Sequence, residues 1–114
     1  MSQFHSISPV AAVELLRSGD ACLVDIRDRA SFSLGHAPGA FHLTNETLGT
    51  FLQQTDPDSP VVVMCYHGHS SQGVAQYLVN HGFENVYNLE GGFAAWQLAC
   101  PVVSAGLDVA GGGV

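Results

Sequence analysis

The sequence predicts an α/β domain with a mostly parallel sheet that is covered by helices on both faces. Short apolar segments alternate along the chain with segments whose apolar residues recur at helical spacing, which is typical of βαβ units. Two apolar segments, residues 21–26 and 61–64, are nearly continuous, as expected for strands buried on both faces. The length of 114 residues suits one domain with one core.

The first half of the chain is expected to contain three strands and two helices. The first helix should begin after Ser8, a favourable N-cap, with Pro9 at its first position. Residues 29–39 are polar and contain glycines, so we expect a loop with at most one helical turn. Either Thr44 or Asn45 is expected to cap the second helix. The strands are expected at residues 4–7, 21–26 and 40–43.

The centre of the chain predicts a strand, a loop and a helix within residues 60–82. The apolar run at residues 61–64 stops at Cys65, and a short polar loop follows. Apolar residues at helical spacing then continue to Gly82, which is a suitable helix stop. This order places a thiol at the carboxyl end of a buried strand and before the N-terminus of a helix.

The end of the chain is expected to complete the domain. A last strand is predicted at residues 86–89, and the pair Gly91 and Gly92 is expected to open a short helix. Residues 1–99 are interpreted as a single domain. Residues 100–114 are apolar but rich in Gly and Ala, so we expect an irregular tail.

Cys65 is the candidate catalytic residue. Ligands of open α/β sheets bind beyond the carboxyl ends of the strands, where Cys65 is predicted to lie. Because N–H groups at a helix N-terminus stabilise anions, the pKa of Cys65 is expected to fall below the free value of about 8.5. A buried core cysteine that ends a strand is the alternative interpretation. The candidate substrate-binding groups are the loop N–H groups of Tyr66, His67, Gly68, His69, Ser70 and Ser71.

The polar side chains of the loop leave several interpretations open. With Cys65 the two histidines form a Cys-x-His-x-His pattern, but ligands so close together rarely face one tetrahedral ion, and we predict no metal. His67 and His69 are interpreted either as pH-sensitive cations beside a bound anion or as exposed loop residues. Ser70 and Ser71 are expected to cap the helix first and to donate to an anion second.

The charge of the chain limits its partners. Ten acidic residues face three arginines and no lysine, for a net charge of −7. This composition argues against nucleic-acid binding, which requires clustered cations. Any anionic substrate would therefore be held by local backbone dipoles rather than by a general positive field.

The sequence also predicts a cytoplasmic protein with no membrane association. No apolar run approaches the length of a membrane span, and the first residues, MSQFHSIS, lack the features of a secretory signal. Cys22, Cys65 and Cys100 are too widely spaced for a disulfide framework or a zinc site. We expect all three to be free thiols in a reducing compartment.

Four motifs in order resemble the rhodanese family. They are LVDIRD at residues 23–28, F-x-x-GH-x-x-GA at 32–40, the Cys65 loop, and GGF-x-x-W at 91–96. The resemblance covers nearly the whole chain and is strongest to single-domain thiosulfate sulfurtransferases of the GlpE type. It implies a three-layer α/β/α fold with a five-stranded parallel sheet in the order 1-5-4-2-3, which places the Cys65 strand centrally.

The resemblance also implies a sulfur-transfer mechanism without a cofactor. The Cys65 thiolate would attack the sulfane sulfur of thiosulfate, sulfite would leave, and Cys65 would carry a persulfide. Cyanide or a dithiol such as thioredoxin would then accept the sulfur. Unlike many members of the family, this loop has no Arg or Lys, so we expect weak anion binding, with His67 or His69 as partial substitutes.

Within the same motifs, Asp25 and Arg27 have two interpretations. Arg27 would either contribute positive potential near the site or pair with Asp25 and fix the neighbouring loops. The second interpretation is favoured because most charged motif residues of small domains are structural.

Three other functions are weighed against sulfur transfer from thiosulfate. A phosphatase or an arsenate reductase on this fold would need a C-x5-R loop, but the arginine position holds Ser71 and no arginine follows Cys65. A non-catalytic partner-binding module would be expected to lack the cysteine. A carrier that receives its persulfide from another protein would keep Cys65 and use the acidic surface for docking.

Overall fold

A computed structural model describes residues 3–104, in which strands and helices alternate from one end to the other. None of these helices is long and apolar enough to cross a bilayer. The elements are β1 (His5–Ile7), α1 (Pro9–Arg17), β2 (Cys22–Asp25), α2 (Arg29–Leu34), β3 (Phe41–His42), α3 (Leu48–Gln54), β4 (Val61–Met64), α4 (Ser70–Asn80), β5 (Val86–Leu89) and α5 (Gly92–Ala99).

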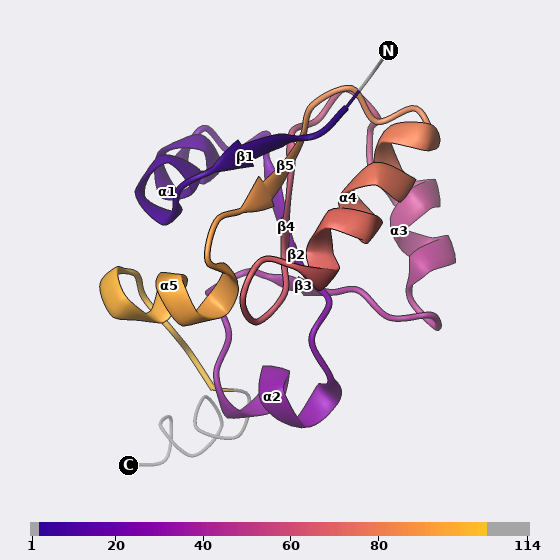
Figure 1. Ribbon diagram of the computed structural model, residues 1–114. Helices are drawn as coiled ribbons and strands as arrows, with labels where there is room; N and C mark the ends of the chain where they lie inside the picture. Colours follow the sequence, from indigo (N-terminus) through magenta and orange to yellow (C-terminus); the bar gives the residue numbers. More distant parts are fainter. Residues whose placement is uncertain (1–2, 105–114) are drawn as a thin grey trace.

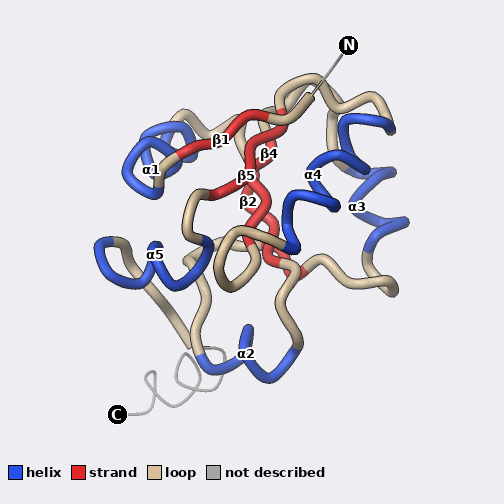
Figure 2. The backbone as a smooth tube through the Cα atoms, viewed as in Figure 1, coloured by secondary structure: helices blue, strands red, loops and turns tan. Residues whose placement is uncertain are grey.

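The five strands form one parallel sheet in the order β1-β5-β4-β2-β3. Figure 2 shows the strands in red between the blue helices. This order confirms the sheet that the resemblance to rhodaneses implied. Strand β4 lies at the centre, where Val63 is the register partner of Val24 in β2 and of Asn88 in β5. Parallel neighbours present their carboxyl ends at one edge, so the residues that follow β2, β4 and β5 meet there.

Helices cover both faces of the sheet, which confirms the three-layer arrangement (Figure 1). On one face α3 and α4 contribute Phe51, Ala75 and Leu78 to a core cluster that includes Val61 and Val63 of β4. On the other face α1 and α5 contribute Ala12, Phe93 and Trp96 to a second cluster that includes Val62 and Met64. Alternate residues of β4 therefore serve opposite cores, because successive side chains of a strand point to opposite faces.

The burial of β4 explains its continuous apolar sequence. All four of its residues, Val61 to Met64, are 0% exposed. Burying one such side chain stabilises a fold by about 1.5–3 kcal/mol, so this strand is a rigid base for the residue that follows it. That residue is Cys65.

Two helices differ from the prediction, and side-chain hydrogen bonds explain both differences. Residues 29–34 form the six-residue helix α2 rather than a loop with one turn at most, because Asp28 caps it and accepts hydrogen bonds from the Ser31 N–H and hydroxyl at 3.1 and 2.7 Å. Helix α3 begins at Leu48, later than a cap at Thr44 or Asn45 would place it. Thr44 instead closes a preceding turn with Thr47, whose hydroxyl accepts from the Thr44 N–H at 2.8 Å.

The first helix begins as predicted. Ser8 is the N-cap of α1, its hydroxyl accepts from the Ala11 N–H at 3.2 Å, and Pro9 occupies the first helical position. The strand segments of the prediction also hold, with ends that are shorter by one or two residues at β1, β2 and β3.

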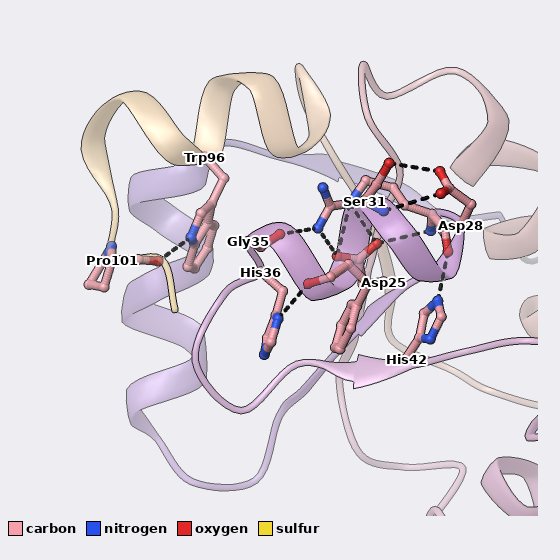
Figure 3. A network of polar contacts seen from close by, with 10 residues as sticks. Asp25, Asp28, Ser31, Gly35, His36, His42, Trp96 and Pro101 are labelled. Carbon is pink, nitrogen blue, oxygen red and sulfur yellow. Dashed lines mark hydrogen bonds and ion pairs between the residues drawn. The ribbon is translucent and has the colours of Figure 1, made fainter. Parts of the chain in front are cut away.

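The chain beyond α5 returns to the region of α2. The Trp96 indole N–H donates to Pro101 O at 2.7 Å (Figure 3). Val103 and His36 exchange two backbone hydrogen bonds of 2.8 Å in an isolated antiparallel bridge. Part of the segment expected to be an irregular tail is therefore held against the β2–β3 connection, and residues 105–114 lie outside the described residues.

A buried ion pair joins β2 to the same connection. Asp25 is 0% exposed and Arg27 is 7% exposed. The Arg27 guanidinium donates from Nε and Nη2 to the Asp25 carboxylate, with Nη2 to Oδ2 at 2.7 Å, and from Nη2 to Gly35 O at 2.7 Å (Figure 3). The guanidinium also lies over the Phe93 ring, 3.8 Å from its centroid. The structure thus agrees with the interpretation in which Arg27 pairs with Asp25 and fixes the neighbouring loops.

We predict that Arg27→Ala will lower the free energy of unfolding by about 3–5 kcal/mol, because it leaves the Asp25 carboxylate buried without its partner. Urea denaturation followed by circular dichroism measures the change. Arg17→Ala is the matched control, since its pair with Glu14 is exposed and such pairs contribute little. Equal effects of the two substitutions would contradict the prediction.

Candidate active site

Cys65 lies directly after β4, at the carboxyl edge of the sheet, and is 6% exposed. The polypeptide then turns through residues 66–69 before α4 begins. Within this turn the Gly68 N–H donates to Cys65 Sγ over 3.1 Å. The strand, loop and helix of the prediction are therefore present, and the loop folds back over the sulfur.

Gly68 gives the loop its shape. Its φ of +93° lies in the left-handed region that side chains rarely adopt. A Cβ at this position would also lie 3.2 Å from Gly91 N and from Leu89 O. The absence of a side chain thus allows the loop to turn its N–H towards the sulfur while it packs against the β5–α5 connection.

The N-terminus of α4 completes the surroundings of the sulfur. The helix is capped by His69, without a side-chain hydrogen bond, so Ser70 and Ser71 are its first two residues and not N-caps as expected. The Ser71 hydroxyl donates to Asn88 Oδ1. Ser71 is 0% exposed, whereas Ser70 lies on the surface.

The pKa of the Cys65 thiol is lowered by its surroundings. Burial alone would raise the pKa, but hydrogen bonds from the Ser71 hydroxyl and from the N–H groups of Ser71, Gly68 and His67 outweigh it. Each of these donors favours the thiolate over the thiol. Among the six loop residues expected to bind an anion, the structure therefore directs the groups of His67, Gly68 and Ser71 at the sulfur.

Helix α5 supports the loop from the other side. The Phe93 N–H donates to Cys65 O at 2.8 Å, and the Ala94 N–H donates to Tyr66 O at 3.0 Å. A Cβ on Gly92 would lie 2.5 Å from Cys65 O, so only glycine permits this approach. The Gly-Gly pair that was expected to open a helix therefore also fixes the carbonyl groups behind the sulfur.

Asn88 is the main residue of the site that the sequence did not reveal. It lies in β5 and is 5% exposed. Its amide accepts from the Ser71 hydroxyl and donates from Nδ2 to Gly68 O at 3.1 Å. The sequence feature that could have identified Asn88 is an amide side chain inside an otherwise apolar strand. That strand is the parallel neighbour of β4, which Cys65 follows.

The remaining loop residues are exposed. Tyr66, His67 and His69 all lie on the surface, and the Tyr66 ring stands edge-on to that of His67 with centroids 4.8 Å apart. Within residues 3–104, no three His, Cys, Asp or Glu side chains are grouped as a metal site would require. The exposed-loop interpretation of the histidines agrees with their positions, and a role as pH-sensitive cations stays a prediction.

A pocket of about 300 Å³ opens beside the loop. Tyr66, Phe93 and Arg27 line it, so it offers aromatic walls and the edge of a guanidinium that is already bound to Asp25. A larger pocket of about 630 Å³ lies against α3 and α4, but none of residues 65–71 lines it. Cys65 lines neither of these two pockets, and Tyr66 is the residue of the cysteine loop that borders the smaller one.

Residues 8–99 match the rhodanese-like domain family. Because this match covers most of the chain, the protein belongs to that family. A rhodanese-like domain that keeps its cysteine loop indicates sulfur transfer as the general activity.

Solved structures of related proteins share the fold. A rhodanese-like domain protein from Staphylococcus aureus is 28% identical, with a TM-score of 0.70 over 82% of this chain and 91% of that chain. A Rhodopseudomonas palustris protein, described as of unknown function and a possible tyrosine phosphatase, is 30% identical, with a TM-score of 0.72 over 88% of this chain and 85% of that chain. The thiosulfate sulfurtransferase of Pseudomonas aeruginosa is 20% identical, with a TM-score of 0.79 over 90% of this chain and 20% of that chain. At that identity the last comparison shows the fold alone.

We predict that Cys65 will be alkylated at lower pH than the other two cysteines. Its lowered pKa keeps the thiolate populated as the pH falls towards neutral, whereas burial raises the pKa of Cys22 and of Cys100. The rate of iodoacetamide labelling is measured across a pH series and assigned to each cysteine by peptide mapping. The midpoint is the pH at which the labelling rate of a thiol reaches half its maximum. A midpoint for Cys65 at or above that of free cysteine would show that the loop does not stabilise the thiolate.

Proposed function

We propose that the protein is a cytoplasmic thiosulfate sulfurtransferase that works through a persulfide on Cys65. The observation that carries the proposal is the set of hydrogen-bond donors around a sulfur whose pKa is lowered, at the end of the central strand of a rhodanese-like domain. A low pKa supplies the nucleophilic thiolate, and the same donors suit the anionic persulfide that follows.

In the first half of the reaction, the Cys65 thiolate attacks the outer sulfur of thiosulfate. The new S–S bond forms as the bond between the two sulfur atoms of thiosulfate breaks, and sulfite leaves with that electron pair. Cys65 then carries a persulfide with one negative charge. The Gly68 N–H, 3.1 Å from Sγ, is placed to stabilise charge on the sulfur before and after the transfer.

In the second half, an acceptor attacks the outer persulfide sulfur and restores the Cys65 thiolate. Cyanide would leave as thiocyanate. A dithiol such as thioredoxin would first take the sulfur as its own persulfide, and its second thiol would then release hydrogen sulfide and form a disulfide. A cytoplasmic location agrees with this chemistry, because a reducing compartment keeps all three cysteines as thiols.

We predict that incubation with thiosulfate will add the mass of one sulfur atom to the intact protein. Cys65→Ser should abolish the adduct, and Cys22→Ser/Cys100→Ser should retain it. Intact-mass spectrometry before and after the addition of cyanide or reduced thioredoxin measures both halves of the reaction. No adduct at high thiosulfate concentration, with Cys65 shown to be reactive by alkylation, would exclude thiosulfate as the donor.

The persulfide-carrier alternative is separated by the same assay. A carrier would gain the sulfur from a persulfidated protein donor and not from thiosulfate. A partner-binding module without catalysis would form the adduct with neither donor.

A phosphatase is the second candidate, because the 30% identical Rhodopseudomonas palustris protein is described as a possible tyrosine phosphatase. The loop argues against this activity here. The position of the phosphate-binding arginine holds Ser71, which is buried and paired with Asn88, and the Arg27 guanidinium is bound to Asp25.

We therefore predict no hydrolysis of para-nitrophenyl phosphate above the level of Cys65→Ser, because the cysteine loop contains no arginine and the Arg27 guanidinium is bound to Asp25. Release of nitrophenol, followed by absorbance, measures the rate. Hydrolysis that is lost in Cys65→Ser would favour the phosphatase.

A further inference from the structure

Asn88 is a buried polar side chain with no role in the two apolar cores. It is 5% exposed in β5, between the apolar interior and the cysteine loop. Burying an amide is unfavourable unless its groups are hydrogen-bonded, and Asn88 meets this condition only through the loop. Its Nδ2 donates to Gly68 O at 3.1 Å, and its Oδ1 accepts from the Ser71 hydroxyl.

The partners of Asn88 determine which way its amide faces. The Gly68 carbonyl can only accept, so the amide must turn Nδ2 towards it and Oδ1 towards Ser71. The Ser71 hydroxyl, which has one proton, then donates that proton to Oδ1. This chain of two hydrogen bonds links the turn of the loop to the first turn of α4.

Both partners of Asn88 are also donors to the cysteine. The Gly68 N–H points at Cys65 Sγ over 3.1 Å, while the Gly68 carbonyl points at Asn88. The hydrogen bonds of Ser71 help to lower the pKa of the Cys65 thiol. Gly68 has no side chain that could anchor it, and its φ is +93°. The hydrogen bond from Asn88 in β5 therefore restrains the orientation of its peptide groups.

We propose that Asn88 is a positioning residue for sulfur transfer, which holds Gly68 and Ser71 so that their donors converge on the Cys65 sulfur. The proposal rests on the function proposed above and adds to it a residue that does not touch the reacting atoms. The exposed Gln72 side chain gives limited help, since its Nε2 also donates to Gly68 O at 3.0 Å but does not reach Ser71 in the described contacts.

The Ser71 proton gives Asn88 a second part in the same task. While Cys65 is a thiol, the hydroxyl donates to Asn88 Oδ1. When the sulfur is a thiolate or a persulfide anion, the hydroxyl turns to the sulfur, because an anion is the stronger acceptor. Asn88 thus keeps the hydroxyl within reach of the sulfur and accepts its hydrogen bond whenever the sulfur is uncharged.

The test is the pH profile of alkylation in a Cys22→Ser/Cys100→Ser background. We expect Asn88→Ala to raise the midpoint for Cys65, so that labelling by iodoacetamide near neutral pH becomes about tenfold slower, which corresponds to one pKa unit. Asn85→Ala is the matched control, since Asn85 is exposed and donates to Asp58 O at 3.3 Å, away from the loop. Asn85→Ala should keep the parent profile.

Two outcomes would overturn the proposal. A folded Asn88→Ala protein with the parent midpoint would mean that Asn88 only fills space. A lower midpoint would mean that Asn88 withholds the Ser71 proton from the sulfur rather than positioning it. Neither outcome depends on thiosulfate. If the proposed function is wrong, the parent protein forms no persulfide with thiosulfate, and that result is obtained in a separate experiment.

A measurement on the parent protein covers the case in which Asn88→Ala does not fold. In ¹⁵N-labelled protein, the side-chain amide signals of Asn88 and the backbone signal of Gly68 should shift with the same pH midpoint as Cys65 alkylation. Asn80 offers an exposed reference amide in α4, whose signals should not follow that midpoint. Asn88 signals that ignore the ionisation of Cys65 would overturn the proposal.

Discussion

Charge on the Cys65 sulfur is stabilised mainly by N–H and O–H dipoles, because the loop that surrounds it contains no arginine or lysine. The chain has three arginines and no lysine, and the arginine beside the site, Arg27, is committed to Asp25. Dipoles act over short distances and only in the right orientation. The chemistry of the site therefore depends on how firmly the backbone of the loop is held, more than on the charge of any side chain.

Several parts of the fold hold that backbone. The buried strand β4 fixes Cys65 itself, and the N–H groups that open α5 bind the carbonyl groups of Cys65 and Tyr66. Gly92 permits this approach, and Asn88 ties the turn of the loop to the start of α4. These supports come from β4, β5 and α5, so the geometry around the sulfur does not depend on the loop alone.

The features that could be predicted from the sequence are those with a local signal. The alternation of strands and helices, the Ser8 cap and the cysteine loop depend on neighbouring residues, and the sheet order followed from motifs shared with a known family. The rest depends on contacts across long separations in the sequence. The side chain of Asn88 bonds Gly68, twenty residues earlier, and His36 pairs with Val103. Helix α2 had a local signal and was still predicted wrongly. Asp28 is a favourable N-cap, but the glycines and polar residues that follow it favoured a loop.

The identity of residue 71 connects this architecture to the choice of chemistry. An arginine there would bring a full positive charge, which suits a phosphoryl group that carries two negative charges. Ser71 is instead 0% exposed and neutral, and its hydroxyl is paired with a neutral amide. A buried guanidinium in its place would need a carboxylate partner, and Asn88 is not one. The pair of Ser71 and Asn88 therefore offers dipoles and no full positive charge, which agrees with the singly charged persulfide of the proposed function.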